Sequence, residues 1–141
     1  MISLWELFSI ARGMHGTPWI HQGRTPGVAL DCVGFVEAVG RACGAVPMDL
    51  VIPADYGRTP KPGALEAFVS GFCTRTYEAV PGTLLLLRMP HSIRHVGLCT
   101  GETIIHCIQP YGVVEHGYRH PYTARTASIW RIPNVEYPDG W

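Results

Sequence analysis

Apolar residues at helical spacing form their clearest pattern in residues 32–43, CVGFVEAVGRAC. Val33, Val36 and Val39 recur every three residues, so they fall on one side of an α-helix. Gly44 follows this stretch directly and is suited to end a helix. The pattern therefore predicts a helix that begins at Cys32 and buries one face.

Two further segments of the first half predict short helices, and two predict loops. Residues 1–13 have the spacing of a short amphipathic helix, and residues 63–72 (GALEAFVSGF) have an apolar side of their own. Residues 13–31 and 45–61 are rich in glycine or proline and predict irregular segments on the surface.

After residue 80 the pattern changes from helical spacing to short β-type runs. Aliphatic and aromatic residues form runs that proline, glycine or charged residues separate, as in strands joined by turns. The runs are TLLLLRM (83–89), RHVGLCT (94–100), ETIIHCI (102–108), YGVVE (111–115) and SIWRI (128–132). Helices followed by antiparallel strands predict an α+β fold in which N-terminal helices pack on a sheet.

The length and composition fit a single globular domain over residues 1–141. Hydrophobic residues make up 47% and charged residues 16%, a balance unlike that of a disordered tail or a membrane protein. Eleven Lys plus Arg balance eleven Asp plus Glu, so we expect neither nucleic-acid binding nor membrane insertion. The N-terminal stretch has no basic leading region and carries Glu6 among apolar residues, which argues against a secretory signal.

The cysteines are an odd number without paired metal-ligand spacing: Cys32, Cys43, Cys73, Cys99 and Cys107. A disulfide framework or a four-cysteine zinc site is therefore not expected. Cys32 differs from the others because it follows a Gly-rich loop at a helix start. Backbone N–H groups and the helix dipole stabilise a thiolate there and can lower a cysteine pKa. An inert thiol packed in the core is the alternative.

A nucleophilic cysteine needs a base, and the chain offers histidines at positions 15, 21, 91, 95, 106, 116 and 120. A two-residue turn at Gly101-Glu102 would pair strands so that facing residue numbers sum to 203. His95 and His106 then share one face as diagonal neighbours, and Gly97 leaves space opposite His106. Two unrelated, locally satisfied histidines are the alternative.

Three strings in this order resemble the NlpC-type cysteine peptidases, a papain-like family that cleaves peptide bonds in peptidoglycan stems: DCVGF (31–35), HVGL (95–98) and IIH (104–106). The resemblance covers residues 17 to about 132. It implies a papain-like NlpC-type fold with the nucleophile at a helix N-terminus. It also implies Cys32 as nucleophile, His95 as general base and His106 as the residue that orients the base. No cofactor or metal is implied.

The string TPWIHQGRTPG (17–27) is similar to one found before the catalytic cysteine in the phage-associated branch of that family. This similarity implies a virion protein at a tail tip or baseplate, with other tail proteins as partners, that opens the host cell wall during DNA entry. Many family members carry Tyr where His21 stands, and an imidazole differs from a phenol in charge and tautomer.

The same resemblance places candidate oxyanion and substrate residues around the nucleophile. The backbone N–H of Cys32, with His21, is expected to meet the oxyanion. Arg24, Arg88 and Arg94 are candidates for gripping stem-peptide carboxylates, with ordinary surface charge as the alternative for each. Asp31 is a further candidate for this site. The bond expected to be cut joins γ-D-glutamate to the diamino acid.

Three other interpretations stay open. The chain is a structural tail component whose catalysis is dispensable, or an amidase of the same fold that cuts the sugar–peptide junction. The third is a metal site built from Cys32, His95, His106 or Cys99, although these residues lack the usual zinc-ligand spacing.

Overall fold

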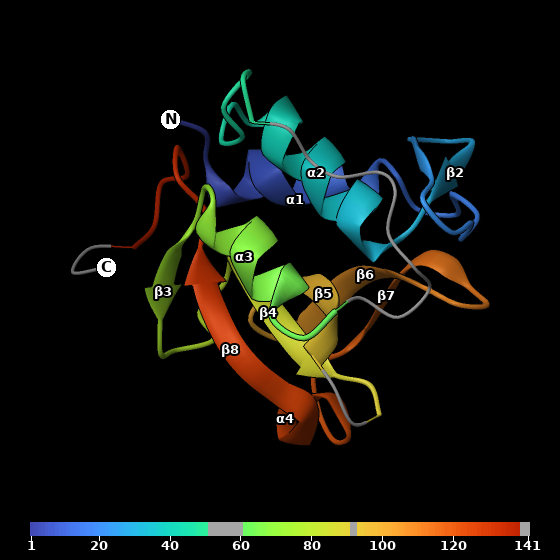
Figure 1. Ribbon diagram of the computed structural model, residues 1–141. Coiled ribbons are helices and arrows are strands. Elements are labelled where there is room, and N and C mark those ends of the chain that lie inside the picture. Colours follow the sequence, from blue (N-terminus) through green and yellow to red (C-terminus); the bar gives the residue numbers. More distant parts are fainter. Residues whose placement is uncertain (51–60, 91–92, 139–141) are drawn as a thin grey trace.

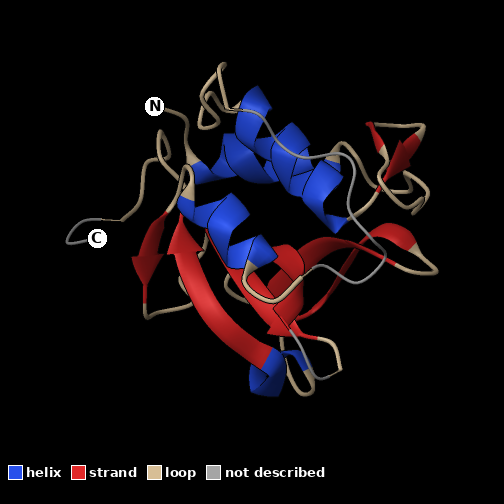
Figure 2. Cartoon of the chain, viewed as in Figure 1, coloured by secondary structure: helices blue, strands red, loops and turns tan. Residues whose placement is uncertain are grey.

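The structure, a computed structural model, describes residues 1–50, 61–90 and 93–138. Figure 1 shows three helices grouped on one side of a sheet: α1 (Leu4–Arg12), α2 (Cys32–Ala42) and α3 (Ala64–Ser70). The short helix α4 (Tyr122–Arg125) lies apart from them, at the opposite end of the sheet (Figure 2). None of the helices in the described part of the chain has the length and apolar character that a membrane span needs.

Among the described residues, six strands form the main sheet in the order β3-β8-β4-β5-β6-β7, with every neighbouring pair antiparallel. Their bounds are Thr74–Thr76 (β3), Thr83–Arg88 (β4), Ile93–Cys99 (β5), Thr103–Ile108 (β6), Gly112–Gly117 (β7) and Thr126–Arg131 (β8). The predicted α+β fold is confirmed, and each of the five predicted strand runs contributes a strand to this sheet.

The sequence patterns miss the shortest elements. Residues 13–31, predicted to be irregular, contain a small hairpin of β1 (Arg24–Thr25) and β2 (Ala29–Leu30). The patterns also predict neither β3 nor α4, because elements of two to four residues are too short to show a period. Residues 51–60 of the predicted loop at 45–61 lie outside the described residues.

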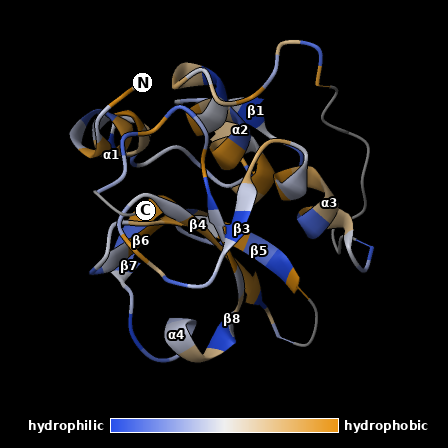
Figure 3. Ribbon diagram, turned by 90° about the vertical axis from the view of Figure 1, so that its left-hand side faces the viewer, coloured by the Kyte–Doolittle hydropathy of each residue, from blue (hydrophilic) through white to orange (hydrophobic). Residues whose placement is uncertain are grey.

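Strand β4 is buried on both faces, which explains its uninterrupted run of leucines. Leu84 and Leu86 belong to a large apolar cluster between the sheet and helices α1 to α3, on what we call the helix face. Leu85 and Leu87 belong to a smaller cluster that includes Tyr122 of α4, on the α4 face. Figure 3 shows apolar segments in orange on α1, α2 and the strands beneath them. The sheet therefore separates two apolar layers.

Candidate active site

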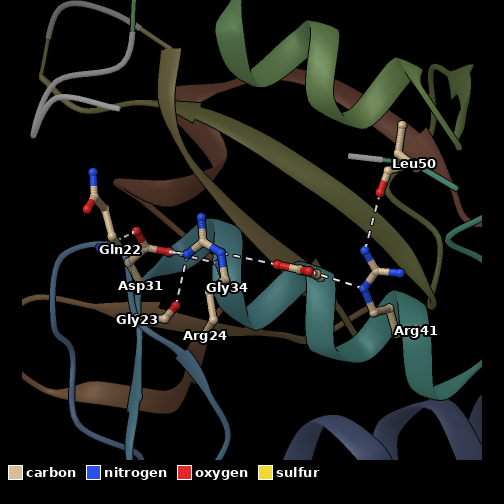
Figure 4. Close-up of polar contacts among 8 residues, drawn as sticks. Gln22, Gly23, Arg24, Asp31, Gly34, Arg41 and Leu50 are labelled. Carbon is tan, nitrogen blue, oxygen red and sulfur yellow. Dashed lines mark hydrogen bonds and ion pairs between the residues drawn. The ribbon is translucent and has the colours of Figure 1, made fainter. Parts of the chain in front are cut away.

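Helix α2 begins at Cys32 because Asp31 caps it. One carboxylate oxygen of Asp31, Oδ1, accepts a hydrogen bond of 2.8 Å from the backbone N–H of Gly34. This bond satisfies one of the N–H groups that the first turn of a helix leaves without a partner. The second oxygen accepts a 3.0 Å hydrogen bond from the backbone N–H of Gln22 (Figure 4). The cap thus ties the preceding loop to the helix start.

Figure 4 shows that an ion-pair network continues from this cap along α2. Nη1 of Arg24 lies 3.0 Å from Asp31 Oδ1, and Nε lies 3.1 Å from a carboxylate oxygen of Glu37. Glu37 also pairs with Arg41 at 3.1 Å. We call Arg24, Asp31, Glu37 and Arg41 the α2-start network. It fixes the loop before Cys32 against the first turns of the helix.

The close packing of this loop also explains why Gly34 is a glycine. A Cβ at this position would collide with the backbone oxygen of Gly23. The same oxygen accepts a 2.9 Å hydrogen bond from Arg24 Nη1. Arg24 and Asp31, named from the sequence as substrate or oxyanion candidates, therefore contact each other and the loop, and a direct contact with substrate stays a prediction for both.

Cys32 is half-buried, whereas the other four cysteines are buried. Its Sγ lies 3.9 Å from the backbone oxygen of Arg94 on β5. The sulfur therefore contacts strand β5 at Arg94, the residue just before His95. The prediction that Cys32 begins a helix is confirmed.

The pKa of the Cys32 thiol departs from the sequence-based expectation. Burial raises this pKa to about 12, and the negative charge of Asp31 contributes in the same direction. Backbone N–H groups of Val96, Val33 and Cys32 itself lower it, as expected at a helix start, but their effect is smaller. The expectation of a lowered thiol pKa is therefore wrong, because loss of water outweighs the helix terminus.

The β5–β6 hairpin has the predicted register. Its paired residues are Leu98 with Ile105 and Cys99 with Ile104, and both pairs of numbers sum to 203. Gly101 has φ +104°, the positive φ that the first central residue of a type II′ turn requires. The predicted two-residue turn is confirmed.

Beyond these two pairs β5 and β6 separate, and α2 packs against both strands. Where the two strands have separated, a side-chain contact joins β5 to β6: His95 Nε2 and His106 Nδ1 lie 2.8 Å apart. Gly97 makes the approach possible, because a Cβ there would lie only 3.0 Å from Cβ of His106. The predicted contact between the two imidazoles is confirmed, while their catalytic roles stay predictions.

The nucleophile and the imidazoles reach this site from different faces of the sheet. His95 pairs directly with Leu87 of β4, so its ring lies on the α4 face. Cys32 arrives with α2 on the helix face and meets the β5 backbone. Among the described residues, its sulfur and the His95 ring share no hydrogen bond. In enzymes such contacts often tighten only when substrate binds.

Burial keeps both imidazoles uncharged at neutral pH. His106 is fully buried and His95 is 6% exposed. Burial lowers the pKa of His95 to about 4 and lowers that of His106 as well, where the charges of His95 and His116 act in the same direction. The thiol and its candidate base are therefore both neutral.

Two residues that the sequence analysis did not select extend the pair. Nε2 of His106 lies 3.0 Å from Nδ1 of His116 on β7, and this Nδ1 lies 3.1 Å from the Tyr122 hydroxyl. The predicted run at 111–115 stops one residue before His116. Because Val114 pairs with His106, a run one residue longer would have included His116 and placed it on the same face as His106.

The remaining candidates differ in burial and in the element that carries them. His21 is half-buried in a turn, Arg94 is half-buried on β5, and Arg88 is exposed at the end of β4. Their contacts with substrate stay predictions. The described residues contain no group of three or more His, Cys, Asp or Glu side chains that could hold a metal ion.

Sequence comparison alone does not assign this chain to a family. No protein-family model matches it, and no curated protein sequence matches it.

Solved structures share its fold, among them the following three. A Staphylococcus aureus Mu50 protein described as similar to a lipoprotein of the NLP/P60 family superposes with TM-score 0.63 and 16% identity, over 95% of this chain and 42% of its own. The NlpC/p60 domain of the peptidoglycan hydrolase SagA gives TM-score 0.61 and 20% identity, over 92% and 98%. A Bacillus cereus ATCC 10987 protein of the NlpC/P60 family gives TM-score 0.65 and 20% identity, over 92% and 40%.

This chain therefore spans less than half the length of the S. aureus and B. cereus neighbours and nearly all of the SagA domain. The predicted papain-like NlpC-type fold is confirmed.

Proposed function

We propose that this chain is a cysteine peptidase that hydrolyses peptide bonds in the stem peptides of bacterial peptidoglycan. The observation that carries the proposal is the hydrogen-bonded pair of His95 and His106 beside a helix-start cysteine, on an NlpC/P60 fold. One structural neighbour is itself described as a peptidoglycan hydrolase. We assign Cys32 as nucleophile, His95 as general base and His106 as the residue that orients the base.

The geometry of the imidazole pair decides which nitrogen of His95 acts. Nε2 is engaged with His106, so Nδ1 is the nitrogen that takes the thiol proton. Sγ of Cys32 attacks the scissile carbonyl carbon as its proton moves to Nδ1, and the resulting tetrahedral intermediate expels the amine, which takes that proton. Water then hydrolyses the thioester with His95 again as base, which releases the carboxylic acid product and restores the free thiol of Cys32.

The neutral resting state shapes this sequence of steps. Because burial raises the pKa of the thiol and lowers that of the imidazole, the proton moves during the attack and not before it. The backbone N–H of Cys32, with His21, is our candidate donor to the oxyanion. Both groups would stabilise charge that appears only in the transition state.

For the substrate we propose the bond between γ-D-glutamate and the diamino acid, in a stem peptide rich in carboxylates. Arg94 is the best placed guanidinium, because its backbone contacts the sulfur and its side chain is half-buried. Arg24 contributes less directly, since it is ion-paired with Asp31 and Glu37. A guanidinium suits bidentate recognition of a carboxylate.

We further propose that the enzyme works in a phage virion, at the tail tip or baseplate, in contact with other tail proteins. The support is the string TPWIHQGRTPG and its similarity to the phage-associated branch. Immunogold labelling or mass spectrometry of purified virions tests this location. A free protein that binds intact sacculi unaided would contradict it.

The decisive experiment for the activity is mass spectrometry of purified peptidoglycan digested by the wild-type chain and by Cys32→Ala. We expect new products with a free diamino-acid amine, and at least about a thousand-fold fewer with Cys32→Ala. Whole stem peptides released from the sugar would instead establish an amidase. Intact peptidoglycan with folded wild-type protein, tested also in the assembled virion, would favour a structural component.

A further inference from the structure

A continuous series of side-chain contacts leads from the candidate base to the edge of the sheet. His95 contacts His106 at 2.8 Å, His106 contacts His116 at 3.0 Å, and His116 contacts the Tyr122 hydroxyl at 3.1 Å. We call these four residues the histidine chain. His106 is fully buried, whereas His116 and Tyr122 are half-buried, so the chain runs from the interior outwards.

The sheet register makes this series possible. The three imidazoles come from β5, β6 and β7, which are neighbours in the sheet. His106 pairs with Val114, so His116, two residues further on, lies on the same face. Tyr122 of α4 then stacks on His116, with ring planes 16° apart and centroids 6.0 Å apart. Each ring is thus held by backbone pairing or by ring packing.

Proton counting shows that the direction of these hydrogen bonds matters. Each nitrogen–nitrogen contact needs one hydrogen, and a neutral imidazole carries only one N–H. If each imidazole donates outwards, His95 is protonated on Nε2 and its Nδ1 can accept the thiol proton. If each donates inwards, His95 carries its hydrogen on Nδ1 and cannot act as a base. The tautomer of His95 is therefore set by what His106 meets on its other side.

We propose that His116 is a positioning residue that accepts a hydrogen bond from Nε2–H of His106 and so keeps His95 in the tautomer that can act as a base. This inference rests on the proposed function, which assigns His95 as the base. The Tyr122 hydroxyl lies 3.1 Å from the same Nδ1 and its ring stacks on the imidazole, so Tyr122 holds the His116 ring in the orientation in which Nδ1 faces His106. More than one residue therefore helps to orient the base.

The tautomer can be measured without any substrate. Two-bond ¹H–¹⁵N correlation spectra of protein labelled with ¹⁵N-histidine, recorded at pH 7, distinguish Nε2–H from Nδ1–H for each ring. We expect the Nε2–H form for His106 in the wild type and in His116→Asn, whose side-chain oxygen replaces the acceptor. In His116→Leu, which offers no acceptor, we expect a mixture of the two forms. The exposed His15, changed to Leu, is the matched control and should leave the His106 signal unchanged.

Hydrolysis of peptidoglycan gives the second readout. We expect His116→Leu to lower kcat by about tenfold or more with little change in KM, since a wrong tautomer disables a base without weakening substrate binding. His116→Asn should keep most of the wild-type kcat. Tyr122→Phe, which keeps the ring and loses the hydroxyl, should have a kcat between those of His116→Leu and the wild type. A wild-type His106 in the Nδ1–H form, or unchanged spectra and kcat in His116→Leu, would overturn the inference. If the wild type cleaves no peptidoglycan, the proposed function fails, and the spectra still test the tautomer separately.

Discussion

Two regions of this molecule hold the two halves of the candidate catalytic pair, and they do so by different physical means. The α2-start network holds Cys32 with full charges and a helix cap, all within residues 22 to 41. The histidine chain holds His95 through hydrogen bonds between rings that come from three strands and a helix. The first arrangement is local in the sequence, whereas the second depends on strand register. Changes to the strand register should therefore misplace His95 and His106, and changes to charge should affect the position and pKa of Cys32.

Among changes that leave the candidate catalytic residues in place, shifting the register is expected to have the largest effect. Inserting one glycine between Gly101 and Glu102 would turn His106 towards the helix face and separate it from His95, because side chains alternate along a strand. We expect at least about a hundred-fold loss of hydrolysis, comparable to the loss of a group that orients a catalytic base. Circular dichroism should show that the variant folds. Inserting two residues returns His106 to the same face as His95 and should recover part of the activity. Equal rates for the two insertions would contradict the assignment of His106 as the residue that orients His95.

The next effect concerns the charged region. Asp31→Asn keeps an acceptor for the helix cap but removes the ion pair with Arg24, whose side chain is 22% exposed. We expect a loss of roughly 2–4 kcal/mol in the free energy of unfolding, measured in urea, because a largely buried guanidinium loses one carboxylate.

The same variant should also change the thiol. The charge of Asp31 raises the pKa of Cys32, so Asp31→Asn should lower it and speed the labelling of Cys32 by iodoacetamide at pH 8. In the folded wild type, Cys32 should label before the four buried cysteines. Slower labelling of Cys32 in Asp31→Asn, or faster labelling of another cysteine in wild-type protein, would count against this account of the site.

A smaller effect is expected from pH, and between pH 7 and pH 5 it should come mainly from the buried histidines. Burial holds the folded-state pKa of His95 near 4, below the value of 6.5 that it has in the unfolded chain. The unfolded chain therefore binds a proton first, and the stability that neutral His95 contributes above pH 6.5 is lost as pH falls towards 4. At pH 5 the loss from this residue is roughly 2 kcal/mol.

Urea unfolding at pH 7 and pH 5 measures this loss. His95→Gln removes the titrating ring and should flatten the dependence, while His15→Gln on the exposed loop should not. His106 contributes in the same direction, since burial lowers its pKa too. His116 and Tyr122 contact the His106 ring, and the same measurement on Tyr122→Phe shows how much the Tyr122 hydroxyl contributes. An unchanged pH dependence in His95→Gln would show that the buried imidazole is not its source.

The smallest effect should follow from filling the space beside His106. In Gly97→Ala the added Cβ would lie 2.7 Å from Cδ1 of Ile104 and 3.0 Å from Cβ of His106. We expect a loss of about 1–2 kcal/mol in stability, typical of overpacking, together with a several-fold fall in kcat as the His106 ring shifts. A stable variant with full activity would show that the imidazole contact tolerates such a shift.

The sequence predicted the parts of this site that depend on local chemistry or on a single turn. Cys32 at a helix start follows from apolar spacing, and the His95–His106 contact follows from a two-residue turn at Gly101-Glu102. The sequence did not predict the Arg24–Asp31 ion pair, because no spacing rule links a loop arginine to a helix cap seven residues later.

The thiol pKa and the far end of the histidine chain were missed for other reasons. Helix-start chemistry favours a thiolate at Cys32, but the amount of water lost by the sulfur depends on the whole fold. His116 lies one residue beyond the recognisable apolar run, and Tyr122 belongs to a helix of four residues without a period. Burial and short elements are thus the two features that local patterns do not contain.

The position of β8 has a consequence for the order in which the protein is completed during synthesis. This strand is last in the chain, yet it lies between β3 and β4, and its residues Thr126–Arg131 pair with both. Cys32, His95 and His106 leave the ribosome earlier, while β4 still presents an open hydrogen-bonding edge. Chains are synthesised from the N-terminus at about 5–20 residues per second. The candidate catalytic residues are therefore all synthesised before β8 can join the sheet that supports them.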